Sequence, residues 1–365
     1  MSTLITIDLD ALEANYRFCR EQMQPASCAA VVKADAYGLG LREIAPVLRH
    51  AGCRQFFTAT HAEGVTLRGL LPDVEIYVFE GVTELSQAAF CDHELVPVLI
   101  SPAHSAFWAN KARSLGRPLP AIIHIDTGMT RLGFGEHELH ELLERPEDLD
   151  WLDTRYIMTH FACADEPGAS TSREQLEQFN RLRQLVPPAP TSVGNSAGGL
   201  LGKDFSGDMA RIGIALFGGN PYQGDMPPLE PVLRVQSRIL QLREISEGTT
   251  VGYGATYQAK SNTRIATVGT GYADGYPWSL GNHGIASIGG HRAPVVGRVS
   301  MDLITLDVTG IPDDLVQPGC MVDLIGPDIS LEEVAERAGT INYEILTRLG
   351  QRARRKFLGG PKAIN

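Results

Sequence analysis

The sequence predicts an α/β protein in which an N-terminal (β/α)8 TIM-type barrel precedes a mainly β C-terminal domain. From residue 28 to about residue 216, short apolar runs of strand length alternate with amphipathic stretches of helical period. After Phe217 the pattern changes, because a loop rich in proline and glycine leads into alternating, hairpin-like segments. A doubly wound parallel sheet is the alternative for the first part, since the number of strands decides between the two folds.

Eight apolar runs are predicted to be the barrel strands. They span residues 28–33, 55–59, 75–80, 95–99, 120–125, 155–160, 190–194 and 209–216. Helix-like stretches lie between many of them, at residues 41–49, 83–90, 102–115, 137–145 and 172–186. Eight strands that alternate with helices over about 190 residues are typical of a barrel.

The second half of the chain is predicted to be a separate domain. We expect residues 1–222 to form the barrel domain, with a first strand that can pair with the C-terminal domain, and residues 223–365 to form the mainly β domain. Strands are predicted within residues 232–245, 264–271 and 285–308. The Gly-Gly pair at residues 289–290 predicts a hairpin turn. Ser330, followed three residues later by Glu333, predicts a capping box that opens a short helix.

Composition and charge argue against several classes of protein. A net charge of −11 without a long basic block disfavours nucleic acid and anionic membranes as partners. Residues 1–20 lack the pattern of a signal peptide, and no run of about 18 apolar residues predicts a membrane span. We therefore expect a soluble cytoplasmic protein. The six cysteines include no C-x-x-C pair, and His137 and His140 are not spaced as in H-E-x-x-H, so no metal site is predicted.

Polar side chains gather at the predicted carboxyl ends of the strands, where a parallel barrel places its chemistry. They are Lys33, Asp126, Arg131, His160, Ser196 and Arg211. Lys33 closes an apolar run, and desolvation of its ammonium group lowers the pKa toward a neutral amine that can form a Schiff base. On this segment alone, a strand-end lysine that extends to water fits equally well. The mixed polar groups on one rim favour a catalytic site.

Two further motifs have more than one interpretation. Residues 194–198, GNSAG, match the G-x-S-x-G of α/β-hydrolases. That fold requires a later acid and histidine, but the last histidine, His291, lies in the hairpin region and no HGGG-type segment occurs. The glycine-flanked serine is also a seat for phosphate, as is the glycine within residues 211–214. The tyrosines of residues 251–257 and 271–276 are core residues by default, but a phenol can transfer protons when a nearby cation lowers its pKa.

Taken together, these segments resemble the alanine racemase family of pyridoxal-phosphate enzymes. The matching segments are VVKADAYGLG, HIDTGMTRLGFG, MTHFACADE, GNSAG, ARIGIALFGG, VGYGATY, GYADGYP and GRVSMDLITLDVT. They follow the family's order from residue 31 to about residue 308, and the LITIDLDALEANYR opening and the NYEILTRL segment also fit. The resemblance therefore covers both predicted domains.

The resemblance implies a role for each matching residue. Lys33 would carry pyridoxal 5'-phosphate as an aldimine and act as one catalytic base, while Tyr253 would be the base on the opposite face, reaching in from the partner subunit of a homodimer. The other cofactor-binding residues would be Tyr37, Ser196, Gly213 and Ile214 at the phosphate, Arg211 at the pyridine nitrogen and His160 along the ring. The substrate-binding residues would be Arg131, the Met301 backbone and Tyr272 at the entry.

The implied activity is interconversion of L- and D-alanine, which supplies D-alanine for peptidoglycan. Two bases on opposite faces of the α-carbon suffice for racemisation, and the cofactor disperses the carbanion's charge. A racemase of broader specificity, acting on serine or other amino acids, is the alternative. A pyridoxal-phosphate-binding barrel without turnover has no need for the second domain. A decarboxylase of the same barrel type would lack the GYGATY and MD segments in this order.

The sequence departs from the family pattern at two positions. The family often has a lysine, carbamylated in some members, where this chain has His124. We expect a bound anion such as chloride, or Asp126, to balance the charge of Arg131 instead. Some members have a phosphate-binding tyrosine where alignment after NYEIL places Gln351.

Overall fold

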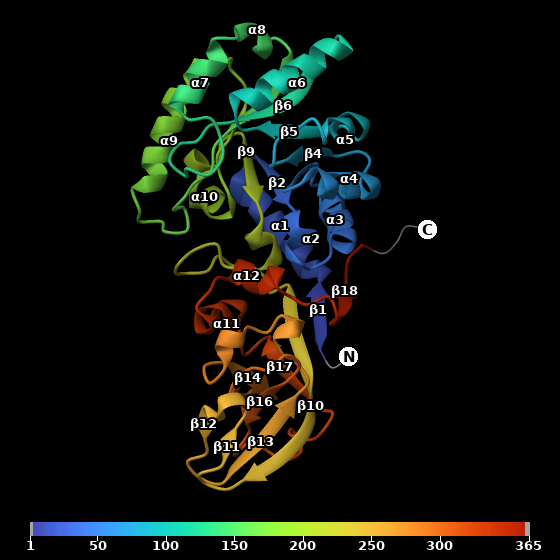
Figure 1. Ribbon diagram of the computed structural model, residues 1–365, viewed down its shortest axis with the longest axis vertical. Helices are drawn as coiled ribbons and strands as arrows, with labels where there is room; N and C mark the ends of the chain where they lie inside the picture. Colours follow the sequence, from blue (N-terminus) through green and yellow to red (C-terminus); the bar gives the residue numbers. More distant parts are fainter. Residues whose placement is uncertain (1–2, 362–365) are drawn as a thin grey trace.

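The computed structural model describes residues 3–361, which form a parallel barrel joined to a mainly β domain (Figure 1). This architecture confirms the predicted fold class. The barrel strands are β2 (Ser27–Val31), β3 (Gln55–Thr58), β4 (Glu75–Val78), β5 (Leu95–Leu99), β6 (Leu119–His124), β7 (Leu152–Met158), β8 (Thr191–Ser192) and β9 (Met209–Ile212). Every neighbouring pair from β8 round to β2 and β9 is parallel.

The barrel is nearly closed, and its last gap lies between β8 and β9. Strand β8 has only two residues, so few ladder bonds are possible there. Hydrogen bonds from Arg211 N–H to the Gly194 carbonyl and from Asp208 N–H to the Thr191 carbonyl, each 2.8 Å, hold the two ends together. Most strand residues are apolar and buried, because side chains fill the interior and helices cover the outside.

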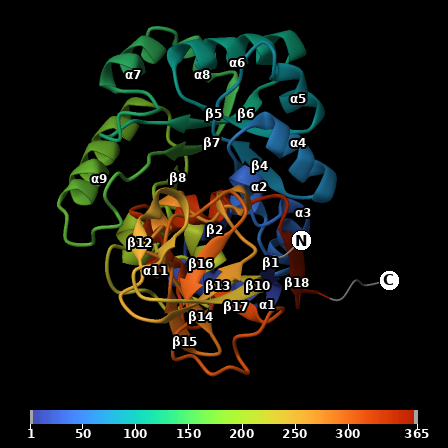
Figure 2. The ribbon, with the colours of Figure 1, turned by 60° about the horizontal axis from the view of Figure 1, so that its bottom comes forward.

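Helices surround the barrel, and local sequence sets where several of them begin. They are α1 (Leu9–Met23), α2 (Lys33–Tyr37), α3 (Leu41–His50), α4 (His61–Leu70), α5 (Gln87–Asp92), α6 (Pro102–Leu115), α7 (Glu136–Leu143), α8 (Pro146–Leu149), α9 (Thr171–Leu182) and α10 (Ser196–Leu201). Asp8 caps α1, and Ser101 caps α6, which has proline in its first turn. Figure 2 shows α4 to α9 in an arc outside the strands.

The C-terminal domain is built on one long strand, β10 (Leu233–Ile245). The other strands of its sheet are β13 (Thr263–Val268), β14 (Ile285–Ile288), β15 (His291–Pro294), β16 (Ile304–Asp307), β17 (Met321–Ile325) and β18 (Arg354–Leu358). The first strand of the chain, β1 (Leu4–Asp8), also belongs here, because it pairs antiparallel with β10 and parallel with β18. The chain therefore starts in the C-terminal sheet before it enters the barrel.

Short elements complete the C-terminal domain. A two-stranded ribbon of β11 (Thr250–Val251) and β12 (Tyr257–Gln258) lies at the end of this domain farthest from the barrel (Figure 1). Helix α11 (Leu331–Ala338) begins at the predicted N-cap, with Ser330 Oγ accepting from the Glu333 N–H at 3.1 Å. The other half of the predicted capping box is not formed, because the Glu333 carboxylate accepts from Arg292 and Arg337 instead. Helix α12 (Asn342–Thr347) lies on the barrel side (Figure 1). In the part of the chain that the structure describes, no helix is both long and apolar enough to cross a membrane.

Candidate active site

Lys33 follows β2 at the carboxyl end of the barrel, in an uncommon backbone turn. The predicted strand 28–33 ends at Val31, and Lys33 opens α2. Ala34, Asp35, Ala36 and Tyr37 all have φ between 52° and 57°, so α2 is a left-handed turn. Each such residue costs about 1–2 kcal/mol relative to right-handed backbone. Surrounding contacts must therefore hold this turn in place.

Partial burial and a neighbouring cation perturb the Lys33 ammonium group. Solvent reaches the lysine, but protein surrounds much of its ammonium, and this desolvation lowers the pKa of Lys33. The positive charge of Arg131 lowers the pKa further, and the negative charge of Glu63 opposes both effects. The Lys33 Nζ lies 5.8 Å from the centre of the Phe79 ring. These surroundings favour the neutral, nucleophilic amine.

Arg211, on β9, is a buried arginine with one unused donor. Its Nη1 donates to the Ser192 carbonyl at 2.8 Å and to Ser192 Oγ at 2.7 Å, and its Nη2 donates to the Thr159 carbonyl at 2.7 Å. Burial lowers the pKa of Arg211 to about 9, but donation to these oxygens favours the charged form, so Arg211 is a cation at pH 7. The buried Nε has no hydrogen-bond partner in the described structure. A buried donor without a partner suggests that a ligand atom completes it.

His160 lies beside Arg211 as a neutral imidazole. Burial, followed by the charges of Arg211 and Arg131, lowers the pKa of His160 well below its ordinary value. Its Nδ1 lies 3.3 Å from Arg211 Nη2 and accepts from it, which assigns the proton to Nε2. The amide of Gln175, from α9, donates to the His160 carbonyl at 3.1 Å and accepts from the Ala162 N–H at 2.9 Å. Gln175, which the sequence did not single out, thus fixes the backbone on both sides of Phe161.

Three predicted phosphate residues from distant segments meet at one place. The Gly213 N–H donates to Ser196 Oγ at 2.8 Å, and Ser196 begins α10 after the N-cap Asn195. A Cβ added at Gly213 would collide with Tyr37 Oη, so only glycine allows the phenol to approach this backbone. Ile214 follows Gly213 and is fully buried. Hydroxyl groups and a close backbone N–H form a cradle that suits the oxygens of a phosphate.

Tyr343 is a neighbour of this cradle that the sequence prediction missed. Its ring centre lies 6.2 Å from that of Tyr37, whose other face packs on Phe217 at 4.8 Å. Burial and the nearby Tyr343 raise the pKa of Tyr37 above its ordinary value. Gln351, where alignment placed the tyrosine of some family members, is exposed. The NYE segment of residues 342–344 contains Tyr343, but the sequence did not connect this tyrosine with the phosphate site.

Arg131 lies in the loop after β6, and no carboxylate within residues 3–361 forms an ion pair with it. Asp126, one of the two counter-charges we considered, instead accepts from the Gly128 and Thr130 N–H groups of its own loop at 3.0 Å. His124 is buried, and desolvation lowers its pKa to about 3, so it is neutral at pH 7. Asp126 is therefore not an ion-pair partner of Arg131.

The predicted residues of the C-terminal domain are exposed. The fractional exposure is 72% for Tyr253, 46% for Tyr272 and 53% for Met301. The Tyr272 N–H donates to the Ser300 carbonyl at 3.1 Å, so the Tyr272 and Met301 segments lie side by side. Tyr253 follows β11 in the ribbon that Figure 1 places far from the barrel. The structure thus gathers the cofactor-side residues and leaves Tyr253 away from Lys33 of the same chain.

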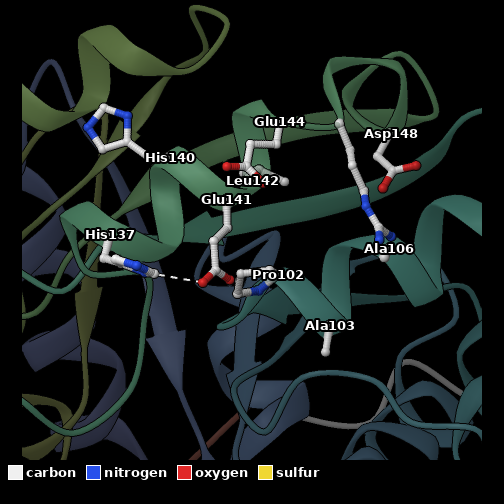
Figure 3. A pocket seen from close by; sticks show the side chains of 10 residues that line it. Pro102, Ala103, Ala106, His137, His140, Glu141, Leu142, Glu144 and Asp148 are labelled. Carbon is white, nitrogen blue, oxygen red and sulfur yellow. Dashed lines mark ion pairs between the residues drawn. The ribbon is translucent and has the colours of Figure 1, made fainter.

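A separate surface pocket of about 580 Å³ lies between α6, α7 and α8 on the outside of the barrel (Figure 3). Its His137 pairs with Glu141 at 3.1 Å, while His140 points away from that pair. Within residues 3–361, no cluster of three metal-ligating side chains occurs. This pocket contains none of the predicted site residues.

Comparison with known proteins covers both domains. Family models match residues 7–221 as "Alanine racemase, N-terminal domain" and residues 232–357 as "Alanine racemase, C-terminal domain". Alanine racemases of Rhodospirillum rubrum and Brucella suis are 46% and 43% identical, over 98% and 97% of this chain and 96% and 93% of theirs.

Solved structures agree with the sequence matches. The alanine racemase of Bartonella henselae with covalently bound pyridoxal phosphate has a TM-score of 0.95 and 38% identity, covering 98% of this chain and 100% of that one. The biosynthetic alanine racemase of Pseudomonas aeruginosa has a TM-score of 0.91 and 33% identity, covering 98% and 99%. The chain belongs to the alanine racemase family.

Proposed function

We propose that this protein is a pyridoxal-phosphate-dependent alanine racemase that interconverts L- and D-alanine. The observation that carries the proposal is the convergence, at one end of the barrel, of the perturbed amine of Lys33 with the unpartnered Nε of buried Arg211. Because the chain belongs to the alanine racemase family, we interpret this convergence as the cofactor-binding part of an active site. No observation favours the racemase of broader specificity.

The residues present fit pyridoxal phosphate. Lys33 would hold it covalently through Nζ, and the unpartnered Nε–H of Arg211 would donate a hydrogen bond to the pyridine nitrogen. Tyr37, Ser196 and the Gly213 and Ile214 backbone would hold the phosphate, with Tyr343 beside them and His160 along the ring. When bound, the cofactor withdraws electrons from the amino acid and so acidifies its α-carbon.

Proton transfer is the work of Lys33 and Tyr253. Lys33 Nζ takes or returns the α-proton on one face of the substrate, and the Tyr253 phenol does so on the other. Arg211 keeps its own proton because it is hydrogen-bonded as a cation, so it leaves the bound pyridine nitrogen unprotonated. This limits charge delocalisation and favours return of the proton over transamination.

Tyr253 needs a second copy of the chain to reach a Lys33. A tyrosine that is 72% exposed at the far end of its own C-terminal domain cannot serve the barrel of the same chain. We propose a homodimer in which each copy lends Tyr253, Tyr272 and the Met301 backbone to its partner's barrel. A two-fold dimer then has two complete sites.

Arg131 and the partner's Met301 backbone would receive the substrate carboxylate, and Tyr272 would line the entry. Because Asp126 does not pair with Arg131, we propose a bound anion such as chloride as the counter-charge. We further propose residues 1–222 and 223–365 as the two domains, with β1 in the second, and a cytoplasmic role in supplying D-alanine for peptidoglycan.

Two variants test the proposal through circular dichroism of alanine and the visible absorbance of the cofactor. Lys33→Ala should lose both the visible band and racemisation. Tyr253→Phe should keep the band and lose about 100-fold or more in rate, since it removes one proton-transfer group. Full activity of Tyr253→Phe would contradict the two-base assignment. Initial rates with L-alanine, L-serine and L-lysine would detect a broader racemase.

A further inference from the structure

The left-handed turn after Lys33 depends on a contact from another part of the barrel. Within the turn, the Ala36 N–H donates to the Val32 carbonyl at 3.0 Å and the Gly38 N–H donates to the Ala34 carbonyl at 2.7 Å. The Ala34 N–H, the first after Lys33, instead donates to Glu63 Oε1 of α4 at 2.7 Å. The residue that directs the Lys33 backbone into the turn is therefore held by a carboxylate 29 positions later.

Glu63 does more than cap its own helix. Its Oε2 accepts from the Ala59 N–H at 2.9 Å and from the Thr60 N–H at 3.3 Å, which completes a capping box with Thr60. A capping box requires only the contact with the N-cap N–H. Because Oε1 extends to Ala34, a single carboxylate joins the end of β3 to the turn that carries Lys33.

The charge of Glu63 also acts on Lys33. The other charged or titratable groups near this lysine are Arg131 from the loop after β6 and His160 from the end of β7, and Arg211 on β9 lies next to His160. Arg131 lowers the pKa of Lys33, whereas Glu63 raises it. His160 is neutral, so Glu63 supplies the negative charge in a surrounding that is otherwise cationic.

We propose that Glu63 is a positioning residue for Lys33, because its carboxylate holds the Ala34 N–H and thereby sets the direction of the Lys33 side chain. This inference rests on the proposed role of Lys33 as a base. Glu63 does not itself exchange a proton. It keeps the lysine pointed at the substrate side of the site.

Three variants of the full chain separate the geometric effect from the charge effect. Glu63→Gln removes the charge and replaces one carboxylate oxygen by an amide NH2 group, which cannot accept from a backbone N–H. Glu63→Asp keeps the charge but is too short to span both contacts. Thr60→Ala breaks the other half of the capping box and leaves the Ala34 contact in place, so it is the matched control.

The first measurement is hydrogen exchange of residues 34–40 in the holoenzyme. Glu63→Gln and Glu63→Asp should exchange faster by about tenfold or more, because the Ala34 N–H loses its acceptor. The second is the rate at which added pyridoxal 5'-phosphate restores the visible band to cofactor-stripped protein, against pH. Its midpoint should fall to lower pH in Glu63→Gln, since a lost negative charge lowers the pKa of Lys33. In Glu63→Asp the midpoint should stay close to that of the wild type.

Thr60→Ala should lower the melting temperature and change neither readout. Wild-type exchange and midpoint in Glu63→Gln, or equal changes in Thr60→Ala, would overturn the proposal and leave Glu63 as a helix cap. A wild-type protein that forms no visible band would instead contradict the proposed function. The exchange measurement would still test the contact between Glu63 and Ala34 in that case.

Discussion

Arg211 and Tyr253 belong to the two halves of the proposed site and differ in how far their own chain buries them. Arg211 is 2% exposed and donates to Ser192 and to the Thr159 carbonyl, whereas Tyr253 is 72% exposed on a short ribbon. In the barrel half, Arg211 is thus buried and hydrogen-bonded by residues of its own chain. The C-terminal half presents exposed side chains, which in the proposed dimer would gain their surroundings from the partner. Variants in the first half should therefore affect folding and cofactor binding, and variants in the second should affect substrate binding and turnover but not folding.

Among the single substitutions, Arg211→Leu is expected to have the largest effect on stability. The change leaves the buried Thr159 carbonyl and Ser192 without their charged donor, so the free energy of unfolding should fall by about 3 kcal/mol or more. Urea denaturation measures it. Arg181→Leu is the control, because it breaks an exposed ion pair with Glu136 that contributes about 1 kcal/mol or less. Equal losses would show that burial does not distinguish the two arginines.

Acid should destabilise the barrel half through its neutral histidines. His124 has a folded pKa of about 3, and the pKa of His160 is also depressed by burial, so the unfolded chain binds protons near pH 6.5 that the folded chain does not. The contribution of His124 is complete above about pH 6.5 and is lost as the pH falls toward 3, at up to about 1.4 kcal/mol per pH unit, and the contribution of His160 is lost in the same direction. Urea titrations from pH 7.5 to 4.5 measure this. His124→Gln should flatten the dependence, and an unchanged slope would disprove the assignment.

Gly213→Ala should weaken cofactor binding with a smaller effect on folding. The new methyl group collides with Tyr37 Oη and displaces the phenol from the phosphate cradle. We expect the Kd for pyridoxal phosphate, measured by absorbance titration, to rise about tenfold, which corresponds to about 1.4 kcal/mol. Gly168→Ala is the control, because a methyl group there meets no atom within 4 Å. If both variants bind alike, the cradle is not the phosphate site.

The smallest effect on stability is expected in the C-terminal half. Tyr253→Phe and Tyr272→Phe should each change the unfolding free energy by less than about 0.5 kcal/mol, since the exposed phenols have no buried partner. Tyr272→Phe should raise KM for alanine more than it lowers kcat. A large loss of stability in either variant would mean that these tyrosines support the fold of their own chain.

Much of the barrel was predictable because local and tertiary preferences agree there. Strand β5 and helix α6 begin and end at the predicted residues, since one is a short apolar run and the other has Pro102 at its start and Gly116 at its end. The predicted helices omitted α4, whose two glycines weaken the helical pattern. The predicted run 209–216 was too long, because the chain leaves β9 before Gly213 and coils from Ile214 to Phe217.

The backbone around Lys33 was not predictable from its residues. Alanine and aspartate at positions 34–36 give no sign of left-handed geometry, which tertiary contacts such as the one from Glu63 stabilise. The partners of Arg211 and the place of Tyr343 beside Tyr37 likewise depend on how distant segments meet. The residues proposed to hold the cofactor were predicted through family motifs rather than through spacing.

The central claim is that each site takes Lys33 from one chain and Tyr253 from another, and mixed dimers test it most directly. Lys33→Ala and Tyr253→Phe chains, each with little or no activity alone, are mixed in equal amounts, dissociated and reassembled. Racemisation should return to about one quarter of the wild-type rate, since about half of the dimers are mixed and each has one intact site. Activity no higher than that of the separate variants would contradict a shared site.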